Sequence, residues 1–377
     1  MPQPRIMHII DALMVGGAEQ VLVDLANRSH RDGHFTAVCV TRGSGPKAKD
    51  LAPGIPVFDL RRAHRFDVLA LWRLRQVIQQ HHVEVLHAHG RSTLAFLMVA
   101  KACGAVRIPI LFHDHYGKIE LDTTVPAWFP FAARHTLSQY VGVHSRLEEW
   151  AWAAGVSRDR ACWVNNALDL SRFDAVAPGT LRPRLGIAPE VLIGVVACGI
   201  RPEKGIDVLL DAIAECQERH RFIIVVIGGA RDATYAATCQ QRARDEQLPV
   251  HFAGEQNHPA EWFKGADFAV LPSRSESGPL VLIEYMACGL PVVSTQTGGI
   301  AQQVAADGVC TMVPPSDPAA LARALDALTT LDAASRRQLG GRAHAYAKRT
   351  FDIGAVMPKW YDLYNRLMIK TPSADHS

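Results

Sequence analysis

Short runs of β-branched and aliphatic residues alternate with segments of helical periodicity along nearly the whole chain of 377 residues. The first pair is a strand predicted at residues 6–10 and a helix predicted at 18–28. The strands are almost continuous apolar runs, which is typical of strands that are covered on both faces. Parallel strands need long crossover connections, usually helices. The sequence therefore predicts an α/β protein built on doubly wound parallel sheets.

The alternation is interrupted once, in residues 173–190, where prolines and glycines cluster: Pro178, Gly179, Pro183, Gly186 and Pro189. This composition is typical of a linker. A second alternating series follows it, and after Pro318 the sequence is helical in character. The expected organisation is a first domain at 1–172, a linker at 173–190, a second domain at 191–354, and a helix with a tail at 355–377. Ligands of such domains bind at the carboxyl ends of the strands.

The individual elements can be assigned from periodicity and from turn residues. The predicted strands are 6–10, 35–41, 57–60, 85–87, 108–112, 139–143, 191–197, 222–227, 250–252, 268–271 and 292–294. The predicted helices are 18–28, 67–80, 92–102, 145–154, 206–219, 235–247, 280–288 and 355–369.

Charge and cysteine content exclude several classes of protein. The 40 basic residues nearly balance the 37 acidic ones, whereas nucleic-acid binders carry a clustered basic excess. The 8 cysteines include no Cys-x-x-Cys pair, which argues against a disulfide framework or a zinc module and fits a reducing compartment. The longest apolar runs have about ten residues, half of a membrane span, and no targeting segment stands out. We expect a cytoplasmic protein, either soluble or peripheral on the inner face of the plasma membrane.

The most informative stretch is 273–291, which directly follows the predicted strand at 268–271. Gly278 fits a helix start and Pro279 fits the first helical position, where a missing N–H has no cost. Gly289 and Pro291, near the end of the stretch, fit a helix stop.

This assignment places two carboxylates around a helix N-terminus. Glu276 lies in the loop and Glu284 lies inside the helix. The free backbone amides of the first turn form an anion site between the two carboxylates. Such a site suits a sugar nucleotide. An isolated pair of this spacing would more often be a capping acid and a solvated helical glutamate, but the strand–loop–helix context favours the binding site.

Two further loops follow predicted strands. Arg201 and Lys204 lie after the strand at 191–197, where fixed cations could neutralise a departing diphosphate; a solvated turn is an equal alternative. Gly16 and Gly17 follow the first strand, where a backbone without side chains can approach a ligand closely. The glycine pair is weak evidence by itself.

Histidines follow two other predicted strands. His87 and His89 form one pair, and His113 and His115 form another. No carboxylate or cysteine lies at ligand spacing, so a metal site is less favoured than hydrogen bonding to a polar substrate or proton exchange near neutral pH.

A basic amphipathic stretch covers residues 61–75. Its arginines are Arg61, Arg62, Arg65, Arg73 and Arg75, and its apolar stripe is Val68, Leu71, Trp72 and Leu74. Such a stretch can lie on an anionic membrane. An ordinary helix that packs on the sheet with a solvated basic face is the favoured alternative.

Taken in order, these motifs resemble those of glycosyltransferase family 4, a group of retaining enzymes with the GT-B fold. The resemblance covers nearly the whole chain. It rests on residues 16–19, 166–173, 201–205 and 276–291, of which the last is the specific one. It implies two Rossmann-like domains that face each other across a cleft, with the helix at 355–369 crossing back to the first domain.

The resemblance also implies roles for individual residues. Glu276 would hold hydroxyls of the transferred sugar, and Glu284 would hold the ribose. Arg201 and Lys204 would bind the diphosphate. The backbone would assist these residues in binding the substrates, at Gly16, Gly17, Gly278, Pro279, Leu280 and Val281. The histidines that would face the substrates are His89, His113 and His115. The leaving phosphate would accept the proton of the acceptor.

No Asp-x-Asp occurs in the chain, so the metal–diphosphate motif of the other major glycosyltransferase fold is missing, and we expect neither a metal nor another cofactor. The resemblance implies transfer of a hexose-type sugar from a UDP- or GDP-linked donor to a hydroxyl acceptor, a lipid-linked or glycan precursor of a cell-envelope polysaccharide. The partners would be the nucleotide sugar, the acceptor and an anionic membrane, with no nucleic acid.

Two rival functions stay open at this point. A nucleotide-sugar epimerase or hydrolase on the same scaffold would need another carboxylate in the crevice, and the sequence offers only Glu276 and Glu284. A non-catalytic sugar-nucleotide binding protein would be supported by an export signal, and none is seen.

Overall fold

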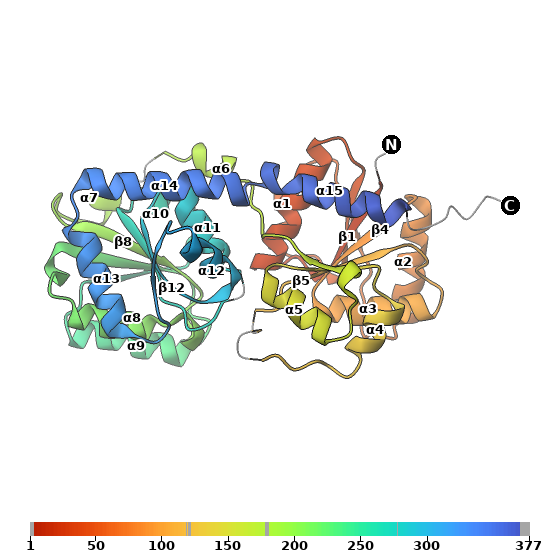
Figure 1. Ribbon diagram of the computed structural model, residues 1–377, viewed down its shortest axis with the longest axis horizontal. Helices are drawn as coiled ribbons and strands as arrows, with labels where there is room; N and C mark the ends of the chain where they lie inside the picture. The colour runs from red at the N-terminus through yellow and green to blue at the C-terminus, as the bar shows by residue number, and fades with distance from the viewer. Residues whose placement is uncertain (1–3, 118, 120–121, 178–180, 277, 370–377) are drawn as a thin grey trace. The chain divides into compact units, whose positions relative to one another are not determined.

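The computed structural model describes residues 4–117, 119, 122–177, 181–276 and 278–369, and the chain divides into two compact units (Figure 1). Unit 1 combines Met1–Asp169 with Phe351–Ser377, and unit 2 is Leu170–Thr350. The expected linker at 173–190 therefore falls within unit 2. The chain returns to unit 1 at Phe351, slightly before the expected residue 355.

Unit 1 contains a seven-stranded parallel sheet in the order β3-β2-β1-β4-β5-β6-β7. The strands are β1 (Ile6–Ala12), β2 (Thr36–Gly43), β3 (Val57–Asp59), β4 (Val85–His89), β5 (Ile110–Asp114), β6 (Gln139–Gly142) and β7 (Ala161–Trp163). All but β7 were predicted. The strand order reverses between β1 and β4, and such a reversal opens a crevice at the carboxyl ends of the strands.

Helices of unit 1 pack on this sheet. They are α1 (Gly17–Arg31), α2 (Val68–Gln80), α3 (Arg91–Ala102), α4 (Phe129–His135), α5 (Ser145–Ala153) and α15 (Ile353–Ile369), with 3₁₀ turns η1 (Pro46–Asp50) and η2 (Arg158–Arg160). The helix α2 is capped by Asp67, which accepts a hydrogen bond from the backbone of Ala70. Large side chains such as Phe112 and Tyr140 are fully buried in the core.

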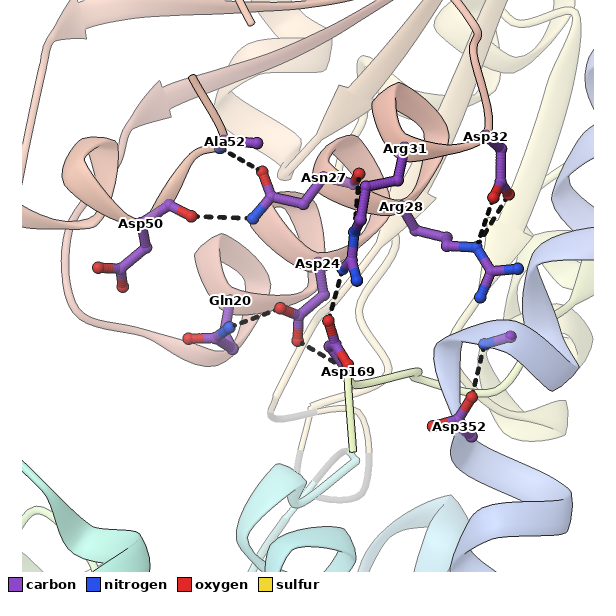
Figure 2. Close-up of polar contacts among 11 residues, drawn as sticks. Gln20, Asp24, Asn27, Arg28, Arg31, Asp32, Asp50, Ala52, Asp169 and Asp352 are labelled. Atoms are coloured by element: carbon purple, nitrogen blue, oxygen red, sulfur yellow. Dashed lines mark hydrogen bonds and ion pairs between the residues drawn. The ribbon is translucent and has the colours of Figure 1, made fainter. Parts of the chain in front are cut away.

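The C-terminal helix α15 packs on unit 1 beside α1, which confirms the expected return of the chain (Figure 1). Its Trp360 and Tyr364 are buried. The outgoing chain is attached to α1 nearby: Asp169 accepts from Arg31 at 2.5 Å and donates its backbone N–H to Asp24 at 3.2 Å (Figure 2). The two segments that lead to and from unit 2 are thus both fixed on unit 1.

Unit 2 contains a six-stranded parallel sheet in the order β10-β9-β8-β11-β12-β13. The strands are β8 (Leu192–Ala197), β9 (Phe222–Ile227), β10 (Val250–Gly254), β11 (Phe268–Leu271), β12 (Val292–Thr295) and β13 (Thr311–Val313). Only β13 was not predicted. Here the strand order reverses between β8 and β11, so the crevice expected from topology lies between the loops that follow these two strands.

Among the described residues, unit 2 contains the predicted helices and four short ones that were not predicted: α6, α7, α10 and α12. In chain order the helices are α6 (Ser171–Asp174), α7 (Leu181–Leu185), α8 (Ile206–Glu215), α9 (Ala233–Asp245), α10 (Pro259–Lys264), α11 (Leu280–Ala287), α12 (Gly298–Ala306), α13 (Pro318–Thr330) and α14 (Ala333–Phe351), with η3 (Pro202–Lys204) and η4 (Arg219–Arg221). In the described part of the chain, no helix has the length and apolar character needed to cross a membrane.

Candidate functional site

The loops after β8 and β11 lie against each other in unit 2. The backbone N–H of Arg274 donates to the carbonyl of Glu203 at 2.8 Å, and the Arg274 guanidinium donates to the carbonyl of Pro202 at 2.8 Å. The two stretches predicted to carry chemistry are therefore adjacent, at the point where the strand order of the sheet reverses.

Gly205 makes this close approach possible. Its backbone is left-handed, with φ of +63°, and a Cβ built on it would lie 2.2 Å from the carbonyl oxygen of Pro272. Both observations exclude a side chain at this position. The Gly205 turn also ends η3 directly after Lys204 and begins α8.

Lys204 and Glu276 form an ion pair across the two loops. The Lys204 Nζ lies 2.6 Å from Oε1 of Glu276, and the same oxygen accepts from the Ser273 hydroxyl at 2.7 Å. Only 17% of the Lys204 side chain and 10% of the Glu276 side chain are exposed. The alternative of a solvated turn for Lys204 is therefore wrong, because its ammonium is held in the crevice.

A second network, which sequence reasoning missed, fixes the same loops. Arg274 makes a bidentate pair with Asp207 at 2.6 and 2.7 Å, and Tyr235 donates its hydroxyl proton to Asp207 at 2.6 Å. Burial alone would raise the pKa of Asp207, but the hydrogen bonds from Arg274 and Tyr235 and the Arg274 charge lower it to about 2. The sequence offered one indication of this network: Arg274 is a cation inside the stretch 273–291, and no role was assigned to it.

Arg201 does not contact the Lys204–Glu276 pair. Its backbone is extended, its side chain is half exposed, and its charged neighbour is Glu203, with 3.7 Å between Nε and Oε2. The structure thus places Arg201 in the predicted loop but leaves its guanidinium toward solvent.

The helix α11 begins at Leu280, as the predicted range 280–288 has it, but Pro279 does not take the first helical position. Pro279 is its N-cap with ψ of 104°, so the first helical residue is Leu280 rather than Pro279. Amides in a first helical turn have no acceptor inside the helix. Of the residues expected to form an anion site, Gly278–Val281, it is Leu280 and Val281 whose amides belong to the first turn of α11.

Glu284 lies inside α11, as predicted, and pairs with Arg172 at 3.1 Å. Arg172 belongs to α6, within the stretch 166–173 that supported the family resemblance. Both side chains are partly exposed. The pair holds the Glu284 carboxylate in place, and 20% of the Glu284 side chain is exposed.

In unit 1, the glycine loop follows β1 as predicted. Gly17 is the first residue of α1, and Gly16 is its N-cap with extended backbone and no side-chain cap. The Glu19 carboxylate folds back over this first turn: it accepts a hydrogen bond from its own backbone N–H, and its Oε2 would lie 2.3 Å from a Cβ at Gly16.

His87, His89 and His113 lie in strands, because β4 extends to His89 and β5 to Asp114, whereas His115 follows its strand as predicted. His87, His89 and His113 are fully buried, and His115 is partly buried. Burial lowers the pKa of His115 to about 3 and keeps the pKa values of the other three well below the usual range. These lowered pKa values keep the rings neutral at pH 7, which argues against the expected proton exchange near neutral pH.

The basic stretch 61–75 uses two of its arginines internally. Arg62 is buried and pairs with Asp11 at 2.7 Å, and Arg73 donates to the carbonyl of Leu60 at 2.8 Å. Leu71 and Leu74 of α2 are buried in the core. With Arg62 and Arg73 bonded internally, the outer face of this stretch is less basic than expected. It is also more apolar than expected, because four large apolar side chains are more than half exposed: Phe66, Val68, Leu69 and Trp72.

The two parallel-sheet units and the returning helix define the GT-B fold, and known structures with this arrangement superpose on the chain. HepE of Anabaena, solved with UDP and glucose, has a TM-score of 0.79 at 20% identity, over 96% of this chain and 100% of its own. A glycosyltransferase of Rickettsia africae has a TM-score of 0.83 at 16% identity, over 98% of this chain and 100% of its own. At these identities the likeness concerns the fold.

Sequence comparison gives the family. The model "Glycosyltransferase Family 4" matches residues 15–172, and the model "Glycosyl transferases group 1" matches residues 191–330. The chain belongs to glycosyltransferase family 4. A D-inositol 3-phosphate glycosyltransferase of Catenulispora acidiphila is 34% identical over 224 residues, which is 56% of this chain and 52% of the relative. One from Xylanimonas cellulosilytica is 33% identical over 58% of this chain and 54% of the relative. The matched stretch is therefore about half the length of these relatives.

Proposed function

We propose that the protein is a retaining glycosyltransferase that moves a hexose-type sugar from a UDP- or GDP-linked donor to a hydroxyl acceptor. The observation that carries this proposal is the Lys204–Glu276 pair at the point where the strand order of unit 2 reverses. A cation and a carboxylate held together there offer one group to a diphosphate and one to sugar hydroxyls.

The lysine would act on the leaving group. Negative charge on the diphosphate grows as the glycosidic bond breaks, so a fixed cation stabilises the transition state more than the ground state. Lys204 is already held by Glu276 and by the turn at Gly205, and little reorganisation is needed when the donor binds. Arg201, which is exposed, would close on the diphosphate from the solvent side.

Glu276 and Glu284 would recognise different parts of the donor. Glu276 lies in the loop before α11 and would accept hydrogen bonds from sugar hydroxyls. Glu284 lies one to two turns into α11 and would hold the ribose, with the amides of Leu280 and Val281 close to the phosphates. The leaving phosphate would accept the proton of the acceptor, so no separate protein base is required.

The neutralisation of the diphosphate by Lys204 and Arg201 supports transfer that is independent of Mg²⁺ or Mn²⁺. In unit 1, the backbone at Gly16 and Gly17 would contact the substrates, and so would His89, His113 and His115.

The acceptor would be a lipid-linked or glycan precursor of a cell-envelope polysaccharide, reached at an anionic membrane. Phe66, Val68, Leu69 and Trp72 expose apolar surface at the start of α2, and the Arg65 guanidinium lies 5.0 Å from the Phe66 ring centroid. Apolar side chains flanked by arginines are typical of helices that lie in an anionic bilayer interface.

A donor panel tests the proposal. Thermal unfolding is followed with UDP- and GDP-linked sugars, because a ligand that binds only the folded state raises Tm. The donor that binds is then incubated with lipid-linked acceptors and with D-inositol 3-phosphate, the compound in the names of the curated relatives. Formation of a glycoside with retained anomeric configuration is expected. Release of free sugar or an epimerised nucleotide sugar as the main product would contradict transfer, and Lys204→Ala is the control for activity from contaminants.

A further inference from the structure

Five histidines of unit 1 gather on one face of its sheet. Three neighbouring strands, β1, β4 and β5, supply them. His8 is paired in register with His87, and His89 with His113. His87 and His89 are two residues apart, as are His113 and His115, and residues at this spacing share a face of a strand.

Their ring nitrogens approach each other in two chains of contacts. In the first, Nδ1 of His8 lies 3.2 Å from Nε2 of His89, and Nδ1 of His89 lies 3.2 Å from Nε2 of His115. In the second, Nε2 of His87 lies 3.3 Å from Nδ1 of His113, and Nδ1 of His87 lies 2.8 Å from the Tyr364 hydroxyl.

Two buried nitrogens of the cluster have no hydrogen-bond partner among the residues that the structure describes. They are Nε2 of His8 and Nε2 of His113, and both side chains are fully buried. A buried polar atom without a partner destabilises the folded state. The ring of His113 lies 4.0 Å from the ring of His115, measured between centroids, and next to His89.

We infer that His89, His113 and His115 form a binding site for a divalent transition-metal ion of the Zn²⁺ type. One ligand nitrogen from each of the three lies within 4.8 Å of the other two. Two nitrogens bound to the same tetrahedral Zn²⁺ at about 2.0–2.1 Å are separated by about 3.3 Å, close to the 3.2 Å between His89 and His115. Three histidines with an open fourth position are a known ligand set for this ion.

The remaining histidines fit the positions of outer-shell groups. With His89 bound to the ion through Nδ1, its Nε2–H donates to His8; with His113 bound through Nε2, its Nδ1–H donates to His87. The second ring nitrogen of a ligating histidine usually makes such a hydrogen bond, which fixes the tautomer and the orientation of the ring. Trp360 of α15 packs on both His87 and His113 and holds their rings in place.

The three candidate ligands supply only nitrogen atoms, which excludes Mg²⁺ and Ca²⁺, ions that prefer oxygen. The site is separate from the diphosphate machinery of unit 2, and the inference does not depend on the proposed sugar transfer.

Calorimetry and Co²⁺ spectroscopy on the tag-free, EDTA-stripped chain test the site. We expect one tight equivalent of Zn²⁺, no comparable binding of Mg²⁺, and the intense visible bands of tetrahedral Co²⁺. His115→Gln changes a partly exposed ligand and should abolish tight binding while the circular dichroism spectrum is retained. His8→Asn should lower the affinity by about 10–100-fold, as loss of an outer-shell group does.

His251→Gln is the matched control, because His251 is an exposed histidine of β10, and it should bind Zn²⁺ like the unaltered chain. Absence of a tight equivalent, weak octahedral Co²⁺ bands, or unchanged binding in His115→Gln would each overturn the site. The Co²⁺ spectrum of the unaltered chain decides the question even where a variant fails to fold.

Discussion

The ammonium group of Lys204 is held 2.6 Å from Oε1 of Glu276, a residue 72 positions further along the chain. The two side chains come from loops after adjacent strands, and both are largely shielded from water. In the free protein, Lys204 compensates the charge of Glu276. In our proposal it also compensates the charge of the diphosphate when the donor is bound. Loss of this lysine must affect stability as well as rate.

Lys204→Ala should lower turnover by about 10²–10³, the usual effect of losing a preorganised electrostatic contact. It should also lower the free energy of unfolding by about 1–3 kcal/mol, since Glu276 would be left shielded without its charged partner. Steady-state kinetics and urea unfolding measure the two effects. Arg201→Ala should slow transfer without changing stability, because Arg201 is exposed, and Lys359→Ala, an exposed lysine of α15, should change neither. Near-normal turnover of Lys204→Ala would remove the diphosphate assignment.

Glu276→Gln and Glu284→Gln should differ in their effect on product binding. If Glu284 holds the ribose, Glu284→Gln should weaken binding of the nucleoside diphosphate. If Glu276 contacts only the sugar, Glu276→Gln should leave that affinity nearly intact while transfer is lost. Calorimetry with the nucleoside diphosphate and a transfer assay separate the two roles. Equal losses of product affinity in both variants would show that this division is wrong.

The apolar strands could be predicted almost to the residue. The prediction of 222–227 and 268–271 agrees with β9 and β11, because continuous β-branched and aliphatic runs have few alternatives to a buried parallel strand. The predicted strand at 85–87 ended two residues before the end of β4, which extends to His89. Polar residues at alternate positions, such as His87 and His89, are typical of a strand with one solvent-exposed face. What buries His87 is Tyr364 and Trp360, some 277 and 273 positions away in the chain, and no local pattern contains that information.

In the candidate site, too, residues within local sequence motifs could be predicted, whereas a pair that depends on tertiary contacts could not. Glu276, Glu284 and Lys204 were found because each lies in a loop or helix start with local signals. The Asp207–Arg274 pair was missed because its partners are 67 positions apart and each looks like an ordinary surface charge. Such an ion pair forms only because β8 pairs with β11 in the sheet. This strand pairing cannot be inferred from a local sequence pattern.

The Asp207 network gives a pH prediction. The pKa of Asp207 is lowered from 3.8 to about 2 in the folded state, so the unfolded chain binds the proton more tightly. The stabilisation is complete above about pH 4 and is lost as the pH falls toward 2. Urea unfolding of the unaltered chain and of Asp207→Asn should show a larger difference at pH 7 than at pH 3. A difference that does not depend on pH would mean that the carboxylate charge contributes nothing.

Transfer should continue in EDTA. Lys204 and Arg201 of unit 2 supply positive charge for the diphosphate, so its neutralisation needs no metal ion. Activity measured before and after chelation should therefore change little, and added Mg²⁺ or Mn²⁺ should not raise it. Loss of transfer in EDTA that Mg²⁺ or Mn²⁺ restores would contradict metal-independent neutralisation of the diphosphate.

Binding to anionic vesicles should depend on the exposed apolar side chains at the start of α2. Transfer of a large apolar side chain out of water contributes about 1.5–3 kcal/mol, or roughly tenfold or more in affinity. Phe66→Ser combined with Trp72→Ser should therefore reduce recovery with anionic liposomes in flotation by a large factor. Leu331→Ser changes an exposed leucine of unit 2 and is the matched control. Recovery of the unaltered chain should fall at high salt, because the flanking arginines act through screened charges. Equal recovery on neutral and anionic vesicles at low salt would contradict the membrane contact.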